Sequence, residues 1–364
     1  MALSPETAAA NQVSPAVRLT PNPRRVLVKE VNWLGDVVMS LPALRAVRRA
    51  FPDAALALLV KHELASFFDG SQWIDSIIPY SVGRGRQGLA DRRRIIAQIR
   101  AGRFDLAVLF PNSFAAAFWA VLGRVPRRAG FVRDARGLLL THKTALVRTL
   151  RKQHQVHDYL YMLRQTLGIN GNPADCVPDV HPPHRVSMQS WLLRHRSRPR
   201  GRLIALGVAA AYGPAKEWPA AHYAKLIDQL AERYSAECVL IGAAAERATC
   251  ERVATASRNG ALVAAGETTV GQMIALLSLC DGFAGNDSGA MHVAAALGLP
   301  TVGIFGSTDA GRTGPLGAKT IVVSHELECS PCLQRTCRFG HYNCLTQITS
   351  DEVLHSLCAL GALE

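Results

Sequence analysis

The chain has no uninterrupted apolar stretch of the roughly 18 residues that a membrane-spanning helix needs. The longest candidate, Val293 to Gly306, is shorter and is interrupted by glycine and proline. The first 20 residues have neither the basic segment nor the apolar segment of a secretory signal. We expect residues 1–22, which are rich in Ala, Ser, Thr and Pro, to be a disordered leader.

Aromatic residues are also scarce, at 6 % of the chain, and they do not interleave with arginine as in many RNA-binding proteins. Acidic residues are few in one region, because residues 91–152 hold fourteen Lys and Arg against three acids. This region accounts for 11 of the net charge of +13. Such a positive field favours an anionic small molecule or a lipid head group over nucleic acid, with a merely solvated basic face as the alternative.

The nine cysteines are an odd number in a chain without a predicted secretory signal, so free thiols are the default. Four of them cluster near the end of the chain, and His341 lies among them. Thiolates at such spacing are able to form a closed, structural zinc site, and a reduced cluster without metal is the alternative. The cluster, within residues 329–344, consists of Cys329, Cys332, Cys337 and Cys344.

Short apolar runs alternate with turns and helical patterns along the chain, which predicts an α/β fold with two doubly wound, Rossmann-like halves. The predicted strands are residues 25–30, 55–60, 105–110, 203–208, 237–242, 261–265, 282–285 and 301–305. The predicted helices include one that ends near residue 50, one that begins after residue 113, and residues 220–234, 246–257, 270–280, 288–297 and 351–363.

The stretch 181–202 is rich in Pro, His and Arg and lacks periodicity, so we predict a linker there. It divides the chain into an N-terminal domain, residues 23–190, and a C-terminal domain, residues 191–364. Ligands of doubly wound sheets bind beyond the carboxyl ends of the strands. We therefore expect the two domains to face each other across a cleft that holds the site.

Asp36 is the first candidate for chemistry, because it follows Gly35 in the turn after the first predicted strand. Glycine permits close approach of the backbone in such a turn. The carboxylate would then lie at the carboxyl end of the strand, where active sites collect. The simpler interpretation is that Asp36 caps the helix that follows.

Two turns in the second half also carry polar residues. The segment from Tyr212 to Pro219 (YGPAKEWP) is a glycine-containing loop that leads to Lys216, an arrangement that suits binding of a phosphate. The spacing of a Walker motif is absent. An ordinary surface lysine is the alternative. Gly285 to Gly289 (GNDSG) opens a helix whose free N–H groups suit an anion. There we expect Asp287 to accept hydrogen bonds from sugar hydroxyls, with His292 about one turn further on.

Glu246 follows the predicted strand 237–242 by a few residues. An acid at this place in a dinucleotide-binding fold often holds ribose hydroxyls. A glutamate in the first turn of a helix, with no ligand, is the alternative.

These motifs in this order resemble the ADP-heptose:lipopolysaccharide heptosyltransferases of glycosyltransferase family nine. The resemblance runs from about Arg25 to the end of the chain. The PNSF segment and the YGPAK loop favour the type II enzymes of the family. The matching segments are WLGDVVMSLPALRAVRRAFP (33–52), FPNSF (110–114), YGPAKEWP (212–219), GNDSGAMHVAAALGLP (285–300) and QRTCRFGHYNC (334–344).

The resemblance implies the glycosyltransferase B (GT-B) architecture, with the acceptor held mainly by the first domain and the nucleotide sugar by the second. It implies an inverting transfer of heptose from ADP-L-glycero-D-manno-heptose to the first heptose of the lipopolysaccharide inner core, with no cofactor needed for catalysis. Such an enzyme is expected in the cytoplasm, transiently at the inner membrane, and without a nucleic-acid partner.

In the pattern of the family, Asp36 matches the proposed general base. Lys216 of the YGPAK loop matches a lysine that contacts phosphate, and Glu246 matches an acid that holds the ribose. Asp287 of the GNDSG turn matches the residue that binds the heptose hydroxyls, and the residues after it match those that bind the diphosphate. The donor-binding residues implied are Tyr212, Gly213, Lys216, Glu246, Asp287, Ser288, Gly289 and His292. On the acceptor side we expect Asn112, Ser113, Arg133 and Arg136.

Four other interpretations stay open. A type I enzyme would transfer heptose to Kdo-lipid A, and an epimerase or hydrolase on the same fold would consume ADP-heptose without an acceptor. A zinc-containing nucleic-acid-binding protein would account for the pI of 9.7 and the cysteines but leaves the GNDSG turn unexplained. A donor-binding protein without activity would leave Asp36 and Lys216 without a use.

Overall fold

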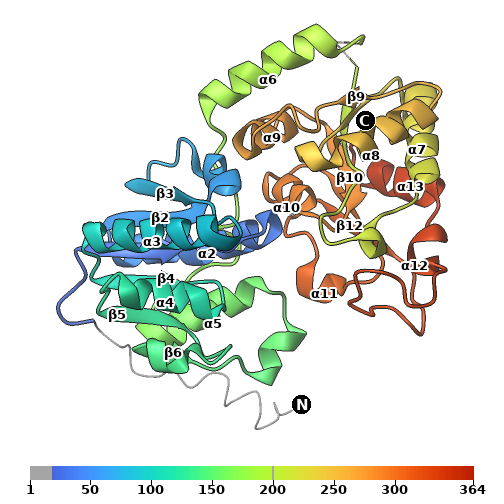
Figure 1. The fold of residues 1–364 in the computed structure, drawn as a ribbon. Coiled ribbons are helices and arrows are strands. Elements are labelled where there is room, and N and C mark those ends of the chain that lie inside the picture. The colour runs from blue at the N-terminus through green and yellow to red at the C-terminus, as the bar shows by residue number, and fades with distance from the viewer. Residues whose placement is uncertain (1–18, 199–200) are drawn as a thin grey trace, which may run out of the picture.

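The computed structural model describes residues 19–198 and 201–364, so residues 1–18 of the predicted leader lie outside it. Two parallel six-stranded sheets, each flanked by helices, form two lobes (Figure 1). Their strand orders are β3-β2-β1-β4-β5-β6 and β12-β11-β10-β7-β8-β9. When the strands are numbered from the first strand of each half, both sheets have the order 3-2-1-4-5-6. This is the strand order of dinucleotide-binding folds. The predicted pair of doubly wound sheets is confirmed.

The N-terminal half has near-continuous buried strands at its centre, as expected for a parallel sheet covered on both faces. Its strands are β1 (Arg25–Lys29), β2 (Ala55–Lys61), β3 (Ser76–Tyr80), β4 (Leu106–Leu109), β5 (Arg127–Phe131) and β6 (His142–Thr144). Its helices are α2 (Leu34–Ala50), α3 (Gly85–Gly102), α4 (Phe114–Leu122) and α5 (Val156–Leu167), with 3-10 turns η1 (His62–Phe68), η2 (Arg136–Leu139) and η3 (Arg148–Lys152).

The C-terminal half repeats this arrangement, and the central strands β7, β10 and β11 are buried along their whole length. Its strands are β7 (Leu203–Gly207), β8 (Glu237–Leu240), β9 (Leu262–Val263), β10 (Gly282–Asn286), β11 (Thr301–Phe305) and β12 (Thr320–Ser324). Its helices are α7 (Ala220–Tyr234), α8 (Arg247–Ala256), α9 (Val270–Leu277), α10 (Gly289–Ala296), α11 (Ala310–Thr313), α12 (Asn343–Thr346) and α13 (Ser350–Ala359), with turns η4 (Pro214–Lys216) and η5 (Ala244–Glu246).

The stretch predicted to be a linker lies between the elements of the two sheets, and it contains the helix α6 (Pro182–His195), which the lack of periodicity did not predict. The two prolines that argued against a helix occupy its first turn, where proline is tolerated. The apolar pattern is weak because the buried residues of α6 are only Met188, Trp191 and Leu192, where the helix packs against α9. The domain boundary proposed between residues 190 and 191 falls inside α6. The other predicted strands and helices are confirmed to within a few residues.

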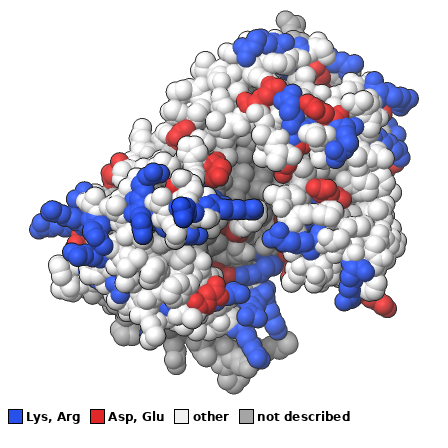
Figure 2. All heavy atoms as spheres, in the orientation of Figure 1, with Lys and Arg blue, Asp and Glu red and all other residues white. Residues whose placement is uncertain are grey.

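The two halves touch where the start of α2 meets α10 and where η1 meets α9 (Figure 1). The space-filling view is hollowed between the two lobes (Figure 2). Over the described part of the chain, no helix combines the length and the apolar character required to span a bilayer.

Candidate active site

Each sheet reverses its strand order at one point, between β1 and β4 in the N-terminal half and between β7 and β10 in the C-terminal half. Ligands of doubly wound sheets bind beyond the carboxyl ends of the strands at this switch point. Asp36 follows β1 and Asn112 follows β4. Lys216 follows β7 and Asp287 follows β10. These four candidates therefore lie after the four strands that frame the two switch points.

The starts of α2 and α10 come close together across the two halves, and glycine makes this approach feasible. A Cβ atom at Gly35 would lie 2.7 Å from Cδ2 of His292. A Cβ atom at Gly289 would lie 2.6 Å from Cβ of Leu34. Free N–H groups and the positive end of the dipole lie at the start of a helix, so two such ends in one place form an anion site.

Asp36 lies in the first turn of α2, where its Oδ1 accepts a hydrogen bond of 2.8 Å from Nε2 of Gln155. The N-cap of α2 is Trp33, so Asp36 does not cap the helix. Burial raises the pKa of Asp36, and the hydrogen bond from Gln155 opposes this effect. The charges of Lys216 and Asp287 lower and raise that pKa, respectively. A desolvated carboxylate with a raised pKa, at the carboxyl end of a switch-point strand, is suited to take up a proton.

Lys216 and Asp287 form a buried ion pair in the C-terminal half. Nζ of Lys216 lies 2.5 Å from Oδ2 of Asp287, and the two side chains are 14 % and 4 % exposed. The same Oδ2 accepts a hydrogen bond of 2.7 Å from Oγ1 of Thr308. Lys216 is therefore held inside the site and is not an ordinary surface lysine.

Two further residues of the GNDSG turn and its helix lie beside this pair. Nε2 of His292 lies 3.9 Å from Oδ1 of Asp287, and burial lowers the pKa of His292 to about 4, so the imidazole is neutral near neutral pH. Ser288 is the N-cap of α10. Within the described chain, the hydroxyl oxygens of Ser288 and Ser307 are buried without a hydrogen-bond partner. Because an unpaired buried hydroxyl is costly, both are suited to pair with a ligand.

The loop before Lys216 is supported by the cysteine-rich segment. The hydroxyl of Tyr212 donates to the carbonyl of Leu333 at 2.7 Å, and Nζ of Lys216 lies 4.8 Å from the centre of the Tyr212 ring. Gly213 has a φ of 138°, and a Cβ atom there would lie 2.7 Å from the carbonyl oxygen of Arg335. The segment that contains the cysteines thus fixes the shape of the loop that carries Lys216.

The four clustered cysteines line one cavity of about 20 Å³ together with His341 and Ser307. Hydrogen bonds from backbone N–H groups, that of Tyr342 above all, lower the pKa of Cys337. Across residues 19–198 and 201–364, no group of three or more His, Cys, Asp or Glu side chains is arranged to hold a metal ion. The structural zinc suggested by the cysteine spacing stays a prediction.

Glu246 ends the turn η5 after β8, as the predicted position requires. Its Oε2 accepts a hydrogen bond of 2.7 Å from the backbone N–H of Ala243. The carboxylate therefore shapes its own turn, and within the described residues its other oxygen makes no hydrogen bond that would prevent it from accepting a ribose hydroxyl.

The residues predicted on the acceptor side divide into a buried and an exposed set. Arg136 is fully buried, and it donates to two backbone carbonyl groups and, at 3.3 Å, to Oδ1 of Asn112. Ser113 is the N-cap of α4, where its Oγ accepts from a backbone N–H at 3.4 Å. Arg133 is 57 % exposed. Arg136 and Ser113 thus hold the loop after β4 in shape, Arg136 from the interior, whereas Ser113 and Arg133 are exposed.

Sequence reasoning missed several residues of the site. Gln155 contacts Asp36, Thr308 contacts Asp287, and Arg312 holds the segment before α5. None of them belongs to a local motif, because their partners are 21 to 162 residues away in the sequence. The nearest available signal was the position of Thr308 just past strand β11, beyond the carboxyl end of a central strand.

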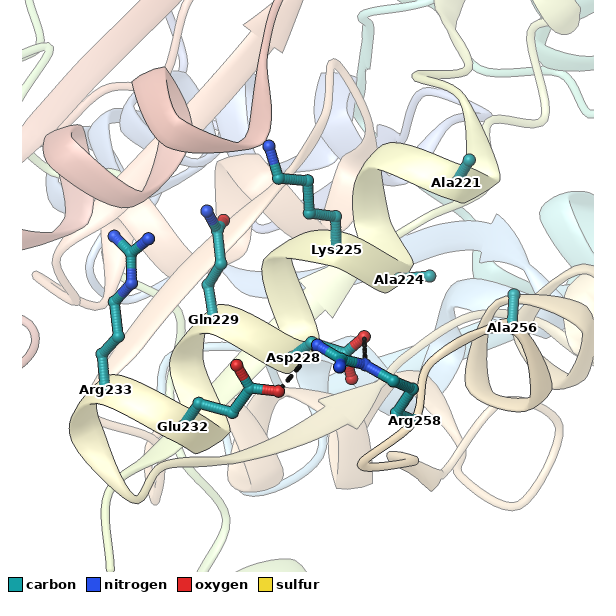
Figure 3. A pocket seen from close by; sticks show the side chains of 9 residues that line it. All are labelled: Ala221, Ala224, Lys225, Asp228, Gln229, Glu232, Arg233, Ala256 and Arg258. Carbon is teal, nitrogen blue, oxygen red and sulfur yellow. Dashed lines mark hydrogen bonds and ion pairs between the residues drawn. The ribbon is translucent and has the colours of Figure 1, made fainter.

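A pocket of about 540 Å³ lies elsewhere, between α7 and the end of α8 (Figure 3). Arg258 reaches across it to Asp228, at 3.5 Å, and to Glu232, at 2.8 Å (Figure 3). These charges pair with one another, and no residue predicted to function lines the pocket. We therefore place the functional site at the switch points.

Comparisons with known proteins show which family the chain resembles. The model of "Glycosyltransferase family 9 (heptosyltransferase)" matches residues 92–343. Lipopolysaccharide heptosyltransferase 2 of Salmonella typhimurium is 30 % identical over 353 residues, which covers 92 % of this chain and 98 % of that protein. The protein of the same name from Escherichia coli is 29 % identical over 347 residues, with coverage of 92 % and 98 %.

A solved structure shows the same architecture over the whole length. The structure of E. coli ADP-heptose lps heptosyltransferase II matches with a TM-score of 0.78 at 26 % identity, and covers 92 % of this chain and 98 % of its own. The two switch points and the paired sheets are thus those of a GT-B enzyme. With a family model that matches most of the chain and relatives that match nearly all of it, this protein belongs to glycosyltransferase family 9, the heptosyltransferases.

Proposed function

We propose that this protein transfers heptose, with inversion, from ADP-heptose to the first heptose of the lipopolysaccharide inner core. The observation that carries the proposal is a carboxylate whose pKa is raised by burial, Asp36, placed across from a donor site that holds Lys216 and the start of α10. Relatives named heptosyltransferase 2 that match over 92 % of the chain support the type of acceptor.

The geometry suggests how the residues act in the reaction. Asp36 takes the proton from the attacking acceptor hydroxyl, whose oxygen forms the new bond to the anomeric carbon. The bond from that carbon to the diphosphate breaks, and its electron pair leaves with the ADP. Lys216 and the N–H groups at the start of α10 stabilise the charge that grows on the diphosphate. In this proposal Lys216 turns from Asp287 to the phosphate, and Asp287 accepts hydrogen bonds from the heptose hydroxyls.

The donor and acceptor are tested by mass spectrometry of the products. Purified protein is incubated with ADP-heptose and, in parallel, Kdo-lipid A without heptose or with one heptose. A gain of one heptose on the second acceptor alone supports the proposal. A gain on the first acceptor assigns type I transfer, and consumption of ADP-heptose without any gain assigns a hydrolase or epimerase.

We also propose that the N-terminal half docks transiently on the anionic cytoplasmic face of the inner membrane. Lys and Arg gather over the N-terminal lobe in Figure 2, and residues 91–152 carry the excess positive charge. Large apolar side chains are exposed on the same half, since Phe114 stacks on Phe118 at 5.7 Å and Leu138 is 94 % exposed. A basic surface with exposed apolar side chains fits an anionic bilayer.

Sedimentation with vesicles tests this docking. The protein should bind vesicles rich in anionic lipid at low salt, and binding should fall as salt rises. Leu138→Ser should weaken binding, whereas Leu193→Ser, at a side chain 77 % exposed on α6, should not. Equal binding to neutral vesicles, or equal effects of the two variants, contradicts the docking surface.

A further inference from the structure

Arg312 in α11 of the C-terminal half reaches into the N-terminal half. Its guanidinium contacts both carboxylate oxygens of Asp158 in the first turn of α5, with Nη1 at 3.1 Å from Oδ1 and Nη2 bonded to Oδ2. Nη1 also donates to the carbonyl groups of Leu150 and Gln153, at 2.9 and 2.7 Å. The side chains of Arg312 and Asp158 are 21 % and 13 % exposed. Water therefore screens this contact far less than it screens an ion pair on the surface.

The backbones of the same two segments are joined as well. The N–H of Gln155 donates to the carbonyl of Arg312 at 2.9 Å, and Nε2 of His154 lies 3.0 Å from the carbonyl oxygen of Gly314. The side-chain amide of Gln155 points the other way, to Asp36 at 2.8 Å and to the hydroxyl of Tyr159 at 3.1 Å. One short segment thus touches the carboxylate of the candidate base and, through its backbone, the other half of the molecule.

We propose that Arg312 and Gln155 are positioning residues through which contact between the two halves orients the carboxylate of Asp36. Arg312 holds residues 150–158, the held segment places the amide of Gln155, and the amide fixes Asp36. The proposal rests on the role of Asp36 as general base under the proposed function. Under this proposal the C-terminal half, which carries the donor residues, helps to orient the carboxylate of Asp36 in the N-terminal half.

The hydrogen bond from Gln155 also has an electrostatic signature. A donor to a carboxylate favours its charged form, so loss of the amide raises the pKa of Asp36 further above its usual range. The other titratable or charged groups that face Asp36 come from the residue after β1, from α5 and η4, and from the turn and helix after β10, and none of them is altered by a substitution of Gln155. These groups are Glu30, Tyr159, Lys216, Asp287 and His292.

The test is a double-mutant cycle on the full chain, with ADP-heptose and the acceptor that carries one heptose. Gln155→Ala and Arg312→Ala should each lower kcat about tenfold and leave the KM for ADP-heptose nearly unchanged. In both variants, the acidic limb of the pH profile of kcat/KM should move to higher pH, because Asp36 is protonated more readily. The double variant should lose no more than either single variant, since both changes act through one amide.

Arg202→Ala is the matched control. Arg202 forms an ion pair with Asp281 at 3.1 Å within the C-terminal half, so its removal deletes a similar contact without touching the N-terminal half. It should change neither kcat nor the acidic limb. Arg312→Lys, which keeps the charge but loses the two-pronged contact with Asp158, should restore part of the activity.

Hydrogen exchange without substrates tests the contact independently of activity. Peptides that cover residues 150–158 should exchange faster in Arg312→Ala than in the wild-type chain, and not in Arg202→Ala. If the wild-type chain transfers no heptose, the proposed function fails, while the exchange still decides whether Arg312 holds the segment. The proposal is overturned if hydrogen exchange of residues 150–158 is unchanged in Arg312→Ala, or if the losses of kcat add in the double variant. It is also overturned if the KM for ADP-heptose rises while the acidic limb of the kcat/KM profile does not move.

Discussion

Asp36 and Asp287 occupy related places in two halves of the same topology, since each follows a switch-point strand at the start of a helix. Their partners differ. Asp36 accepts one hydrogen bond from a neutral amide, and burial raises its pKa. Asp287 pairs with the cation of Lys216 and accepts from Thr308. One backbone plan thus yields a carboxylate suited to take a proton and a carboxylate that pairs with a lysine and accepts hydrogen bonds, and the difference comes from side chains on neighbouring segments.

The strongest test of this contrast is Asp36→Asn. Asparagine keeps an oxygen that accepts from Gln155 but takes up no proton, so transfer should fall by about 10³-fold. Affinity for ADP, measured by calorimetry, should stay the same because the donor site lies in the other half. A comparable loss of ADP affinity would show that Asp36 belongs to the donor site and is not the base.

Lys216→Ala should have the next largest effect. It leaves the carboxylate of Asp287, which is 4 % exposed, without its cation, so the free energy of unfolding should fall by about 3 kcal/mol. Lys216→Met combined with Asp287→Asn should recover most of the stability but not the transfer of heptose. Urea unfolding and steady-state kinetics separate the two effects, and full activity in the double variant would contradict a role for this pair in donor binding.

His292 gives a smaller effect that depends on pH. Its pKa is lowered by burial to about 4, below the ordinary value of 6.5, so the folded chain favours the neutral imidazole. This contribution to stability is present above pH 6.5 and is lost as the pH falls toward 4. Between about pH 7 and about pH 5, the free energy of unfolding should fall by about 2 kcal/mol more in the wild-type chain than in His292→Gln. Parallel stability curves for the two proteins would show that His292 is not held neutral.

Arg133→Ala should have the smallest effect, because Arg133 is 57 % exposed and its charge is screened by solvent. The KM for the anionic acceptor should rise severalfold at low salt, and the difference should vanish at high salt. Arg233→Ala in the C-terminal half, at a side chain 59 % exposed, is the control and should leave the KM unchanged. Equal effects of both variants would indicate that only the net charge matters.

The apolar pattern predicts the fold best where strands are buried on both faces. The bounds predicted for β11 and α7 agree with the structure at both ends. The short apolar run of β11 lies between Pro300 and Gly306, and the amphipathic helix α7 follows Pro219 and ends before Ser235 in a left-handed conformation. The strand β3 escapes prediction because it contains Pro79, which its place at the edge of the sheet tolerates. The helix α3 is missed since only four of its eighteen residues are buried.

The site was predictable where chemistry follows a strand directly. Asp36, Lys216 and Asp287 each come soon after a switch-point strand, so a local motif was enough to find them. The sequence does not reveal that Lys216 pairs with Asp287, nor that Gln155 reaches Asp36 from 119 residues away. These contacts arise only when the two sheets and their connecting segments are packed together, and no periodicity or spacing records them.

Because Gly35 and Gly289 approach the opposite half so closely, each half of the molecule limits the size of the side chain that the other can carry at this contact. A methyl group at either position would act as a spacer between α2 and α10 and would keep the base and the donor site apart. This limit crosses from one domain to the other without any bond between side chains. Exchanging one domain between two members of the family therefore requires glycine on both sides of the contact, however well each domain folds by itself.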